Sequence, residues 1–152
     1  MIKYLFSNVD KVNGFNEQQI KYLSIDLKTC KSILFVPGDY DKEKYIIYKD
    51  KIIGWFENID IIFKEKHLAS LDGELKCYDA IFLMGGNPIN QIEIINKINL
   101  KNIINKAKVV IGVSAGAINL SKEAIYFNDY SKKVEMYDGL GLTDINVYPH
   151  FD

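Results

Sequence analysis

Short apolar runs alternate with longer stretches of helical periodicity along this 152-residue chain. The runs are rich in β-branched and aromatic residues and end at glycine, proline, serine or asparagine, which is typical of buried strands. They predict five strands, at residues 2–6, 32–36, 59–63, 78–84 and 109–113, with helical patterns between them. Such alternation indicates βαβ units. We therefore expect a three-layer α/β fold, a mostly parallel sheet with helices on both faces, in one domain over residues 1–152.

Two of the predicted helices carry informative side chains. Residues 16–29 form the first, whose expected apolar face is Ile20, Leu23, Ile25 and Leu27. The second follows Asp39 or Asp41 and carries the aromatic residues Tyr45, Tyr48, Trp55 and Phe56. At helical spacing these rings favour packing against the sheet over a ligand-binding stripe. A loop is predicted at 67–76, and two further strands at 124–127 and 145–148.

The fifth predicted strand runs directly into Gly112-Val113-Ser114-Ala115-Gly116. A strand that ends in Gly-x-Ser-x-Gly and is followed by a helix is the pattern of a nucleophile elbow, in which the serine occupies the apex of a sharp turn. Gly112 and Gly116 fit the pattern because the turn brings the backbone very close to itself. The alternative is an ordinary strand–turn–helix connection.

A second glycine turn, Gly85-Gly86-Asn87, follows the fourth strand. Ligands of parallel α/β sheets bind at the carboxyl ends of the strands, where this turn and Ser114 are both expected. Acyl transfer needs two donors for an oxyanion, and the amide of Ala115 and one amide of the glycine turn are candidates. A phosphate-binding turn or a plain β–α turn are the alternatives, although neither Gly-x-Gly-x-x-Gly nor a Walker motif is present.

A serine nucleophile needs a base, and the chain has only His67 and His150. His67 lies in a lysine-rich stretch that predicts a solvated loop, whereas His150 follows a predicted strand and Pro149. A carboxylate must orient the histidine. The candidates between Ser114 and His150 are Glu123, Asp129, Glu135, Asp138 and Asp144.

Composition narrows the function classes. A net charge of −1 gives no electrostatic case for nucleic acid or membrane binding. The two cysteines, Cys30 and Cys77, form no disulfide framework or metal motif, so we expect neither a metal nor another cofactor. With no signal peptide and no long apolar run, the expected location is cytoplasmic. All 19 basic residues are lysines, so arginine, the usual bidentate carboxylate ligand, is missing.

Together the motifs resemble the peptidase E (dipeptidase E) and cyanophycinase-type family of serine peptidases. The matching segments occur in the family's order over essentially the whole chain: Ser7-Asn8, Met84-Gly85-Gly86-Asn87, Gly112 to Ala117, Asn128-Asp129 and Pro149-His150-Phe151. The resemblance implies a flavodoxin-like fold related to class I glutamine amidotransferases. It also implies cleavage of small peptides.

Carried over by motif, the resemblance makes Ser114 the nucleophile, His150 the base and Asp129 the acidic partner. The amides of Gly86 and Ala115 would form the oxyanion hole, supported by the turn residues Gly85, Asn87, Gly112 and Gly116. Because the acidic member varies in the family, Glu135 remains the second candidate.

Two departures from the family shape the hypotheses. Family members continue well beyond the His-Phe pair, so we expect this chain to lack the family's C-terminal portion. The arginine that holds a substrate aspartate in peptidase E is missing, so the sequence does not support aspartyl specificity. The leading hypothesis is a serine peptidase of the dipeptidase or aminopeptidase type with a small peptide substrate and a possible homodimeric state. The alternatives are a catalytically impaired fragment that serves as a binding or oligomerisation module, and an amidotransferase-like domain, which Ser114 in place of cysteine disfavours.

Overall fold

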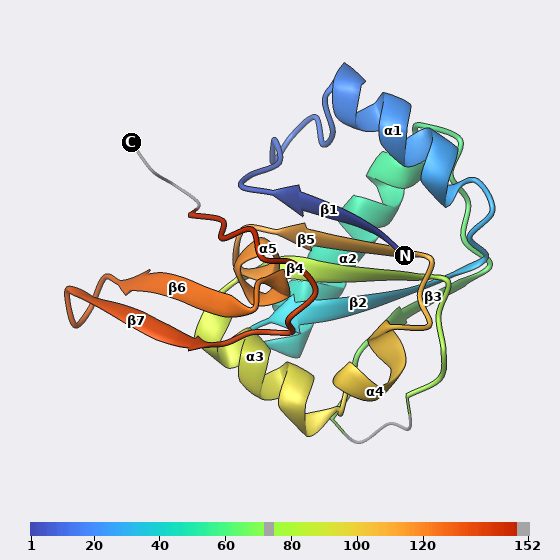
Figure 1. The fold of residues 1–152 in the computed structure, drawn as a ribbon. Helices are drawn as coiled ribbons and strands as arrows, with labels where there is room; N and C mark the ends of the chain where they lie inside the picture. The colour runs from blue at the N-terminus through green and yellow to red at the C-terminus, as the bar shows by residue number, and fades with distance from the viewer. Residues whose placement is uncertain (72–74, 149–152) are drawn as a thin grey trace.

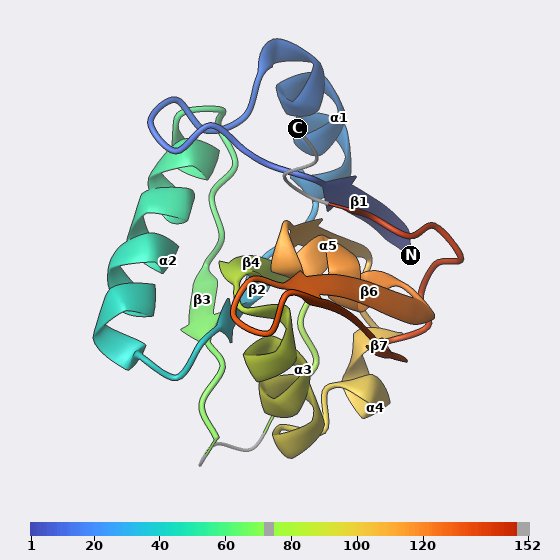
Figure 2. The same cartoon turned by 90° about the vertical axis from the view of Figure 1, so that its left-hand side faces the viewer.

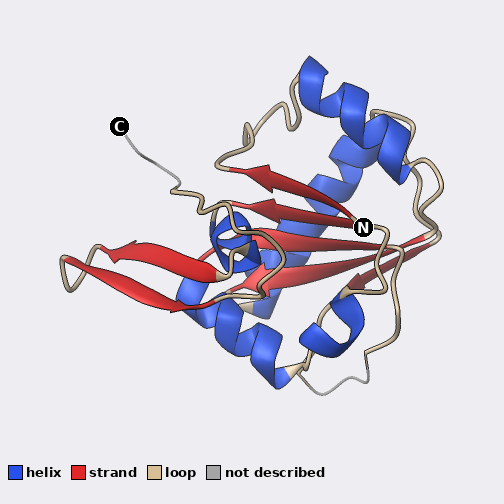
Figure 3. Cartoon of the chain, in the orientation of Figure 1, coloured by secondary structure: helices blue, strands red, loops and turns tan. Residues whose placement is uncertain are grey.

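A computed structural model describes residues 1–71 and 75–148, which build a five-stranded sheet and a separate β-hairpin (Figures 1 and 3). The strands lie in the order β1 (Ile2–Phe6), β5 (Val109–Val113), β4 (Ala80–Gly86), β2 (Ser32–Gly38) and β3 (Glu65–Leu68). Every neighbouring pair is parallel. All five strands therefore end at one edge of the sheet, which we call the carboxyl edge.

Helices cover both faces of the sheet. The helices α1 (Glu17–Leu27) and α2 (Lys42–Glu57) lie on one face, and α3 (Pro88–Lys97) and α4 (Lys101–Ile104) lie on the other (Figure 2). The strand side chains alternate accordingly: Phe35 and Phe82 belong to the core under α1 and α2, and Leu34 and Ile81 belong to the core under α3. This arrangement confirms the predicted α/β class.

The hairpin follows a short helix, α5 (Ala115–Leu120), which begins directly after β5. Its strands, β6 (Glu123–Asn128) and β7 (Lys133–Asp138), pair antiparallel and project beyond the sheet (Figure 1). The chain then returns along the end of α5, where the amide of Leu142 donates to the carbonyl of Leu120 at 3.0 Å. The hairpin is thereby fixed at both of its ends.

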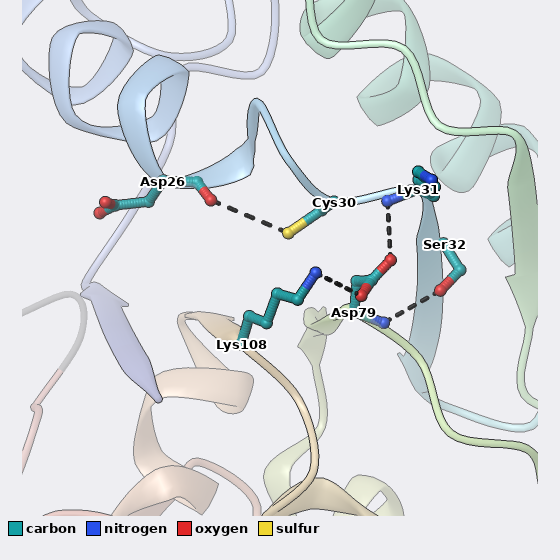
Figure 4. Close-up of polar contacts among 6 residues, drawn as sticks. All are labelled: Asp26, Cys30, Lys31, Ser32, Asp79 and Lys108. Atoms are coloured by element: carbon teal, nitrogen blue, oxygen red, sulfur yellow. Dashed lines mark hydrogen bonds and ion pairs between the residues drawn. The ribbon is translucent and has the colours of Figure 1, made fainter.

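Polar contacts hold the opposite, amino edge of the sheet (Figure 4). The carboxylate of Asp79 accepts a hydrogen bond from the Lys31 amide at 2.8 Å and pairs with Lys108 Nζ at 2.9 Å. The Asp79 amide donates to Ser32 Oγ at 3.0 Å. The Lys108 ammonium group and, after it, the Lys31 amide hold the pKa of the Asp79 carboxyl below its usual range. One carboxylate thus ties together the beginnings of β2, β4 and β5.

The third strand was predicted in the wrong place. Residues 59–63 form no strand; Ile61 and Phe63 are buried as loop residues, and the amide of Ile61 donates to the carbonyl of Phe56. The strand is β3, within Glu65–Leu68, which includes part of the predicted loop. Because β3 is an edge strand, it carries charged residues instead of an apolar run.

Other predicted boundaries also need correction. Residues 145–148 form no strand, whereas β6 is present and pairs with β7, which the sequence did not predict. Ile25, placed on the apolar face of the first helix, is 65% exposed. Among the described helices, none is long and apolar enough to span a bilayer.

Candidate active site

Ser114 lies between the end of β5 and the beginning of α5, with φ 51° and ψ −110°. This combination lies outside the left-handed helical region and is costly for a residue with a Cβ, on the order of 1–3 kcal/mol. Two backbone hydrogen bonds hold it there: the Ser114 amide donates to Phe6 at 2.9 Å, and the Ile118 amide donates to the Ser114 carbonyl at 3.0 Å. Strain of this kind occurs at nucleophile elbows.

The glycines on either side of Ser114 allow close packing. A Cβ on Gly112 would lie 2.6 Å from the carbonyl oxygen of Gly116. A Cβ on Gly116 would overlap the carbonyl group of Leu83 in β4. Larger residues at either position would push α5 away from the sheet and displace Ser114.

The second glycine turn ends β4 beside the serine. A Cβ on Gly85 would be 3.8 Å from the Cβ of Ser114, so the two residues are neighbours. Gly86 has φ 140°, and a Cβ there would lie 2.7 Å from the hydroxyl of Tyr45. Asn87 fixes the turn: its amide donates to Gly38 at 2.9 Å, and its side chain caps α3. The turn is therefore rigidly attached to both β2 and α3.

Two clefts meet at Ser114 and Gly86, which line both. The first, which we call the α2 cleft, has a volume of about 460 Å³ and is lined mainly by α2 and the loop after β1. The second, the hairpin cleft, has a volume of about 320 Å³ and lies between α5 and the hairpin; Ala115 also lines it. The structure thus places Ser114, Gly86 and Ala115 on the wall of one cavity.

The two candidate carboxylates differ in their surroundings. Asp129 lines the hairpin cleft, although its side chain is 82% exposed and lies 3.7 Å from Lys132 Nζ. Glu135 lies on β7, outside the lining of either cleft, and accepts a hydrogen bond from Asn128 Nδ2 at 2.7 Å. Burial raises the pKa of Tyr126, and the nearby charges of Asp129 and Glu135 add to this effect. The structure brings Asp129, and not Glu135, to the cavity of Ser114.

Of the two histidines, only His67 lies among the residues that the structure describes. His150, with Pro149 and the residues after it, lies outside the described residues; Tyr148, the last described one, lines the hairpin cleft. His67 lies on β3, an edge strand that is separated from β5 and Ser114 by β4 and β2. Its side chain is 54% exposed, and the centroid of its ring lies 5.7 Å from that of Tyr78. His67 lines neither cleft.

A buried polar network, which the sequence did not predict, connects the parts of the site. Gln91 of α3 donates to the carbonyls of Met84 (2.7 Å) and Val36 (3.2 Å). Asn119 of α5 donates to Gln91 Oε1 at 3.1 Å and accepts from the hydroxyl of Tyr137 at 2.8 Å. Burial raises the pKa of Tyr137 and keeps this donor protonated. The network joins the strand of the glycine turn to α5 and the hairpin.

The α2 aromatics divide between two roles. Phe56 is fully buried in the core, as predicted. Tyr45, Tyr48 and Trp55 pack against the same core and also line the α2 cleft. Burial is the main reason that the pKa of Tyr45 is raised to about 12, and the negative charges of Asp39 and Asp41 add to this effect. Packing and cleft lining are therefore not exclusive for these rings.

The parallel sheet and the strained serine at a strand–helix turn place this protein among the α/β proteins that carry a serine at the apex of an elbow-like turn. The model of peptidase family S51 matches residues 5–152, and the chain belongs to this family. No curated protein gave a match.

Solved structures support the fold. A candidate peptidase E protein from Listeria monocytogenes EGD-e is similar with a TM-score of 0.63 and 18% identity, over 98% of this chain and 78% of that one. A peptidase from an acI-B1 Actinobacterium is similar with a TM-score of 0.64 and 21% identity, over 88% of this chain. The match spans 62% of the actinobacterial chain, less than two thirds of its length. These likenesses confirm the flavodoxin-like, class I glutamine amidotransferase-like fold.

Proposed function

We propose that this protein is a serine-type peptidase that cleaves small peptides, as a dipeptidase or aminopeptidase, through an acyl-enzyme on Ser114. The observation that carries the proposal is the strained backbone of Ser114. This residue lies beside the Gly85-Gly86 turn and lines both clefts. Clefts of a few hundred Å³ hold ligands of small-molecule size, which suits a short peptide on either side of the serine. Membership of peptidase family S51 supports the same reaction class.

In the proposed mechanism, Ser114 Oγ bonds to the substrate carbonyl carbon while His150 takes its proton. Asp129 orients the histidine and stabilises its charge. The amides of Gly86 and Ala115 hold the negative oxygen of the tetrahedral intermediate. The C–N bond breaks as His150 gives the proton to the leaving amine. Water then attacks the acyl-enzyme, His150 takes its proton, and that proton returns to Ser114 Oγ as the acid leaves.

Labelling with a fluorophosphonate, followed by mass spectrometry, tests the nucleophile. We expect one modified residue, Ser114, and no labelling of Ser114→Ala. The control is Ser131→Ala at the exposed tip of the hairpin, which should leave labelling unchanged. If Ser114 is not labelled, the peptidase proposal fails and a binding or oligomerisation module is favoured.

Matched pairs of variants test the base and its partner. His150→Ala should reduce hydrolysis by on the order of a thousandfold or more, and His67→Ala should have no effect. Asp129→Asn should reduce hydrolysis by on the order of a hundredfold or more, and Glu135→Gln should not. A loss confined to Glu135→Gln would transfer the acidic role to that residue.

A further inference from the structure

The α2 cleft has an apolar floor built by three segments: the loop after β1, α2 and β4. Val9, Tyr45, Ile52 and Phe82 line it and are each less than a tenth exposed. The partly buried rings of Tyr48 and Trp55 form its wall along α2. Substrate atoms in this cleft would therefore contact mainly aromatic and aliphatic carbon.

The wall is fixed in position by the loop that follows β1. Gly14 lies so close to the indole of Trp55 that a Cβ would approach its Cγ to 2.6 Å. Phe15 makes an edge contact with the same ring, with centroids 5.9 Å apart. The wall at Trp55 is thus preformed, because packing against Gly14 and Phe15 holds the indole ring in place.

The charged residues of the cleft are two lysines at its rim. Lys11 and Lys44 are exposed, and Lys44 Nζ lies 5.6 Å from the centroid of the Tyr45 ring. None of the described residues that line the cleft is acidic. A cationic side chain would meet two like charges there. An anionic one would meet only hydrated ammonium groups, since the chain has no arginine.

The position of the second cleft decides which part of the substrate enters the first. The proposed acidic partner, Asp129, lines the hairpin cleft. A general acid that Asp129 orients must reach the leaving amine. The leaving group therefore belongs on the hairpin side of Ser114. The acyl side of the scissile bond then extends into the α2 cleft.

We propose that the α2 cleft is the specificity pocket for the acyl residue and that it selects large apolar and aromatic side chains, such as those of phenylalanine, leucine and methionine. This inference rests on the proposed peptidase function. Burying such a side chain favours binding by about ten- to a hundredfold over alanine. An exposed lysine pair with a carboxylate contributes less than about fivefold. The apolar floor therefore outweighs the lysines.

A series of aminoacyl 4-methylcoumarin-7-amides, with Phe, Leu, Met, Ala, Asp, Glu and Lys as the acyl residue, tests the pocket. We expect kcat/KM for Phe, Leu and Met to exceed that for Ala by about tenfold or more, with Asp and Glu below them and Lys lowest. The series needs no variant, so it does not depend on a substitution that folds.

Variants then locate the selectivity. Tyr48→Ala should lower kcat/KM for the Phe substrate by about fivefold or more relative to the Ala substrate. The matched control is Ile47→Ala, the neighbouring position on α2, whose side chain is 70% exposed and outside the cleft. Lys44→Met should change kcat/KM for the Asp substrate by less than about fivefold.

The outcomes separate the pocket from the reaction. Fastest turnover of Asp, Glu or Lys, or no preference above Ala, overturns the apolar pocket and leaves the peptidase proposal intact. Labelling of Ser114 without turnover of any substrate also overturns the pocket alone. Absence of both labelling and turnover overturns the proposed function and the pocket together.

Discussion

The two edges of the central sheet are built in opposite ways. At the amino edge, Asp79 accepts from Lys31 and pairs with Lys108, and its amide donates to Ser32, so the strands begin in a closed set of polar contacts. At the carboxyl edge, strands of the same sheet end in a glycine turn, a strained serine and two clefts. The comparison suggests a division of roles within the sheet. The amino edge fixes the positions of the strands, and the carboxyl edge can then carry a strained residue beside open clefts.

The largest expected effect concerns the strained serine. Ser114→Gly should abolish hydrolysis and yet raise the free energy of unfolding by about 1 kcal/mol, because glycine adopts positive φ without a steric cost. Peptide hydrolysis and urea denaturation measure the two effects. A less stable Ser114→Gly protein would contradict the interpretation of Ser114 as a strained residue.

Packing at the carboxyl edge gives the next largest effect. Gly116→Ala should lower the free energy of unfolding by about 2–3 kcal/mol, since its Cβ would overlap the Leu83 carbonyl. Gly54→Ala is the matched control: nothing lies within 4 Å of a Cβ there, and the residue is within α2. This control should gain about 0.5–1 kcal/mol. Equal effects at the two glycines would show that α5 does not depend on close contact with β4.

The buried network can be broken by removing one hydroxyl. Tyr137→Phe removes the hydroxyl that donates to Asn119 Oδ1. We expect the free energy of unfolding, measured by thermal unfolding, to fall by about 1–2 kcal/mol. Because β7 carries Tyr137 and pairs with β6, we also expect slower hydrolysis. Tyr130→Phe, at a hairpin-tip residue that is 97% exposed, is the control. A network without influence on the site would leave hydrolysis by Tyr137→Phe at the wild-type rate.

The smallest effect is expected at the amino edge. Asp79→Asn should lower the free energy of unfolding by about 1 kcal/mol at neutral pH, with unchanged hydrolysis per folded molecule. The folded-state pKa of Asp79 lies below its ordinary value of 3.8, so the carboxylate stabilises the fold above that pH. This contribution is lost as the pH falls below about 4, where variant and wild type should converge. Denaturant titrations between pH 3 and 7 measure this; a difference that grows on acidification would contradict it.

The sequence predicted those parts of the fold in which local pattern and burial agree. The apolar run before Ser114 is both β-branched and central in the sheet, so β5 was found with its correct bounds. The edge strand β3 was missed because its Glu65-Lys66-His67-Leu68 pattern has no apolar run. Strand β7 was missed for a related reason: Val134 and Met136 are mostly exposed, and only pairing with β6 defines the strand.

For the candidate site, motifs predicted residues on the backbone turns but not the groups around them. Ser114, Gly86 and Ala115 share a cavity, and Asp129 lines it too. Gln91 and Asn119 resemble surface residues in the sequence, because nothing local shows that two amides meet between helices. Tyr48 and Trp55 lie at core spacing on α2, and only the loop before α1 turns their outer sides into a cleft wall.

The order of strands in the sheet also sets the order of events during synthesis. Ile2 of β1 pairs with Val109 of β5, and Phe6 pairs with Val113, so the first strand made has its partner among the last strands of the sheet. Closing a loop of this length is slow compared with local helix formation. A nascent chain therefore carries β1 unpaired until residue 113 has left the ribosome. Because the amide of Ser114 donates to the carbonyl of Phe6, the strained residue gains this hydrogen bond only when β1 has paired with β5.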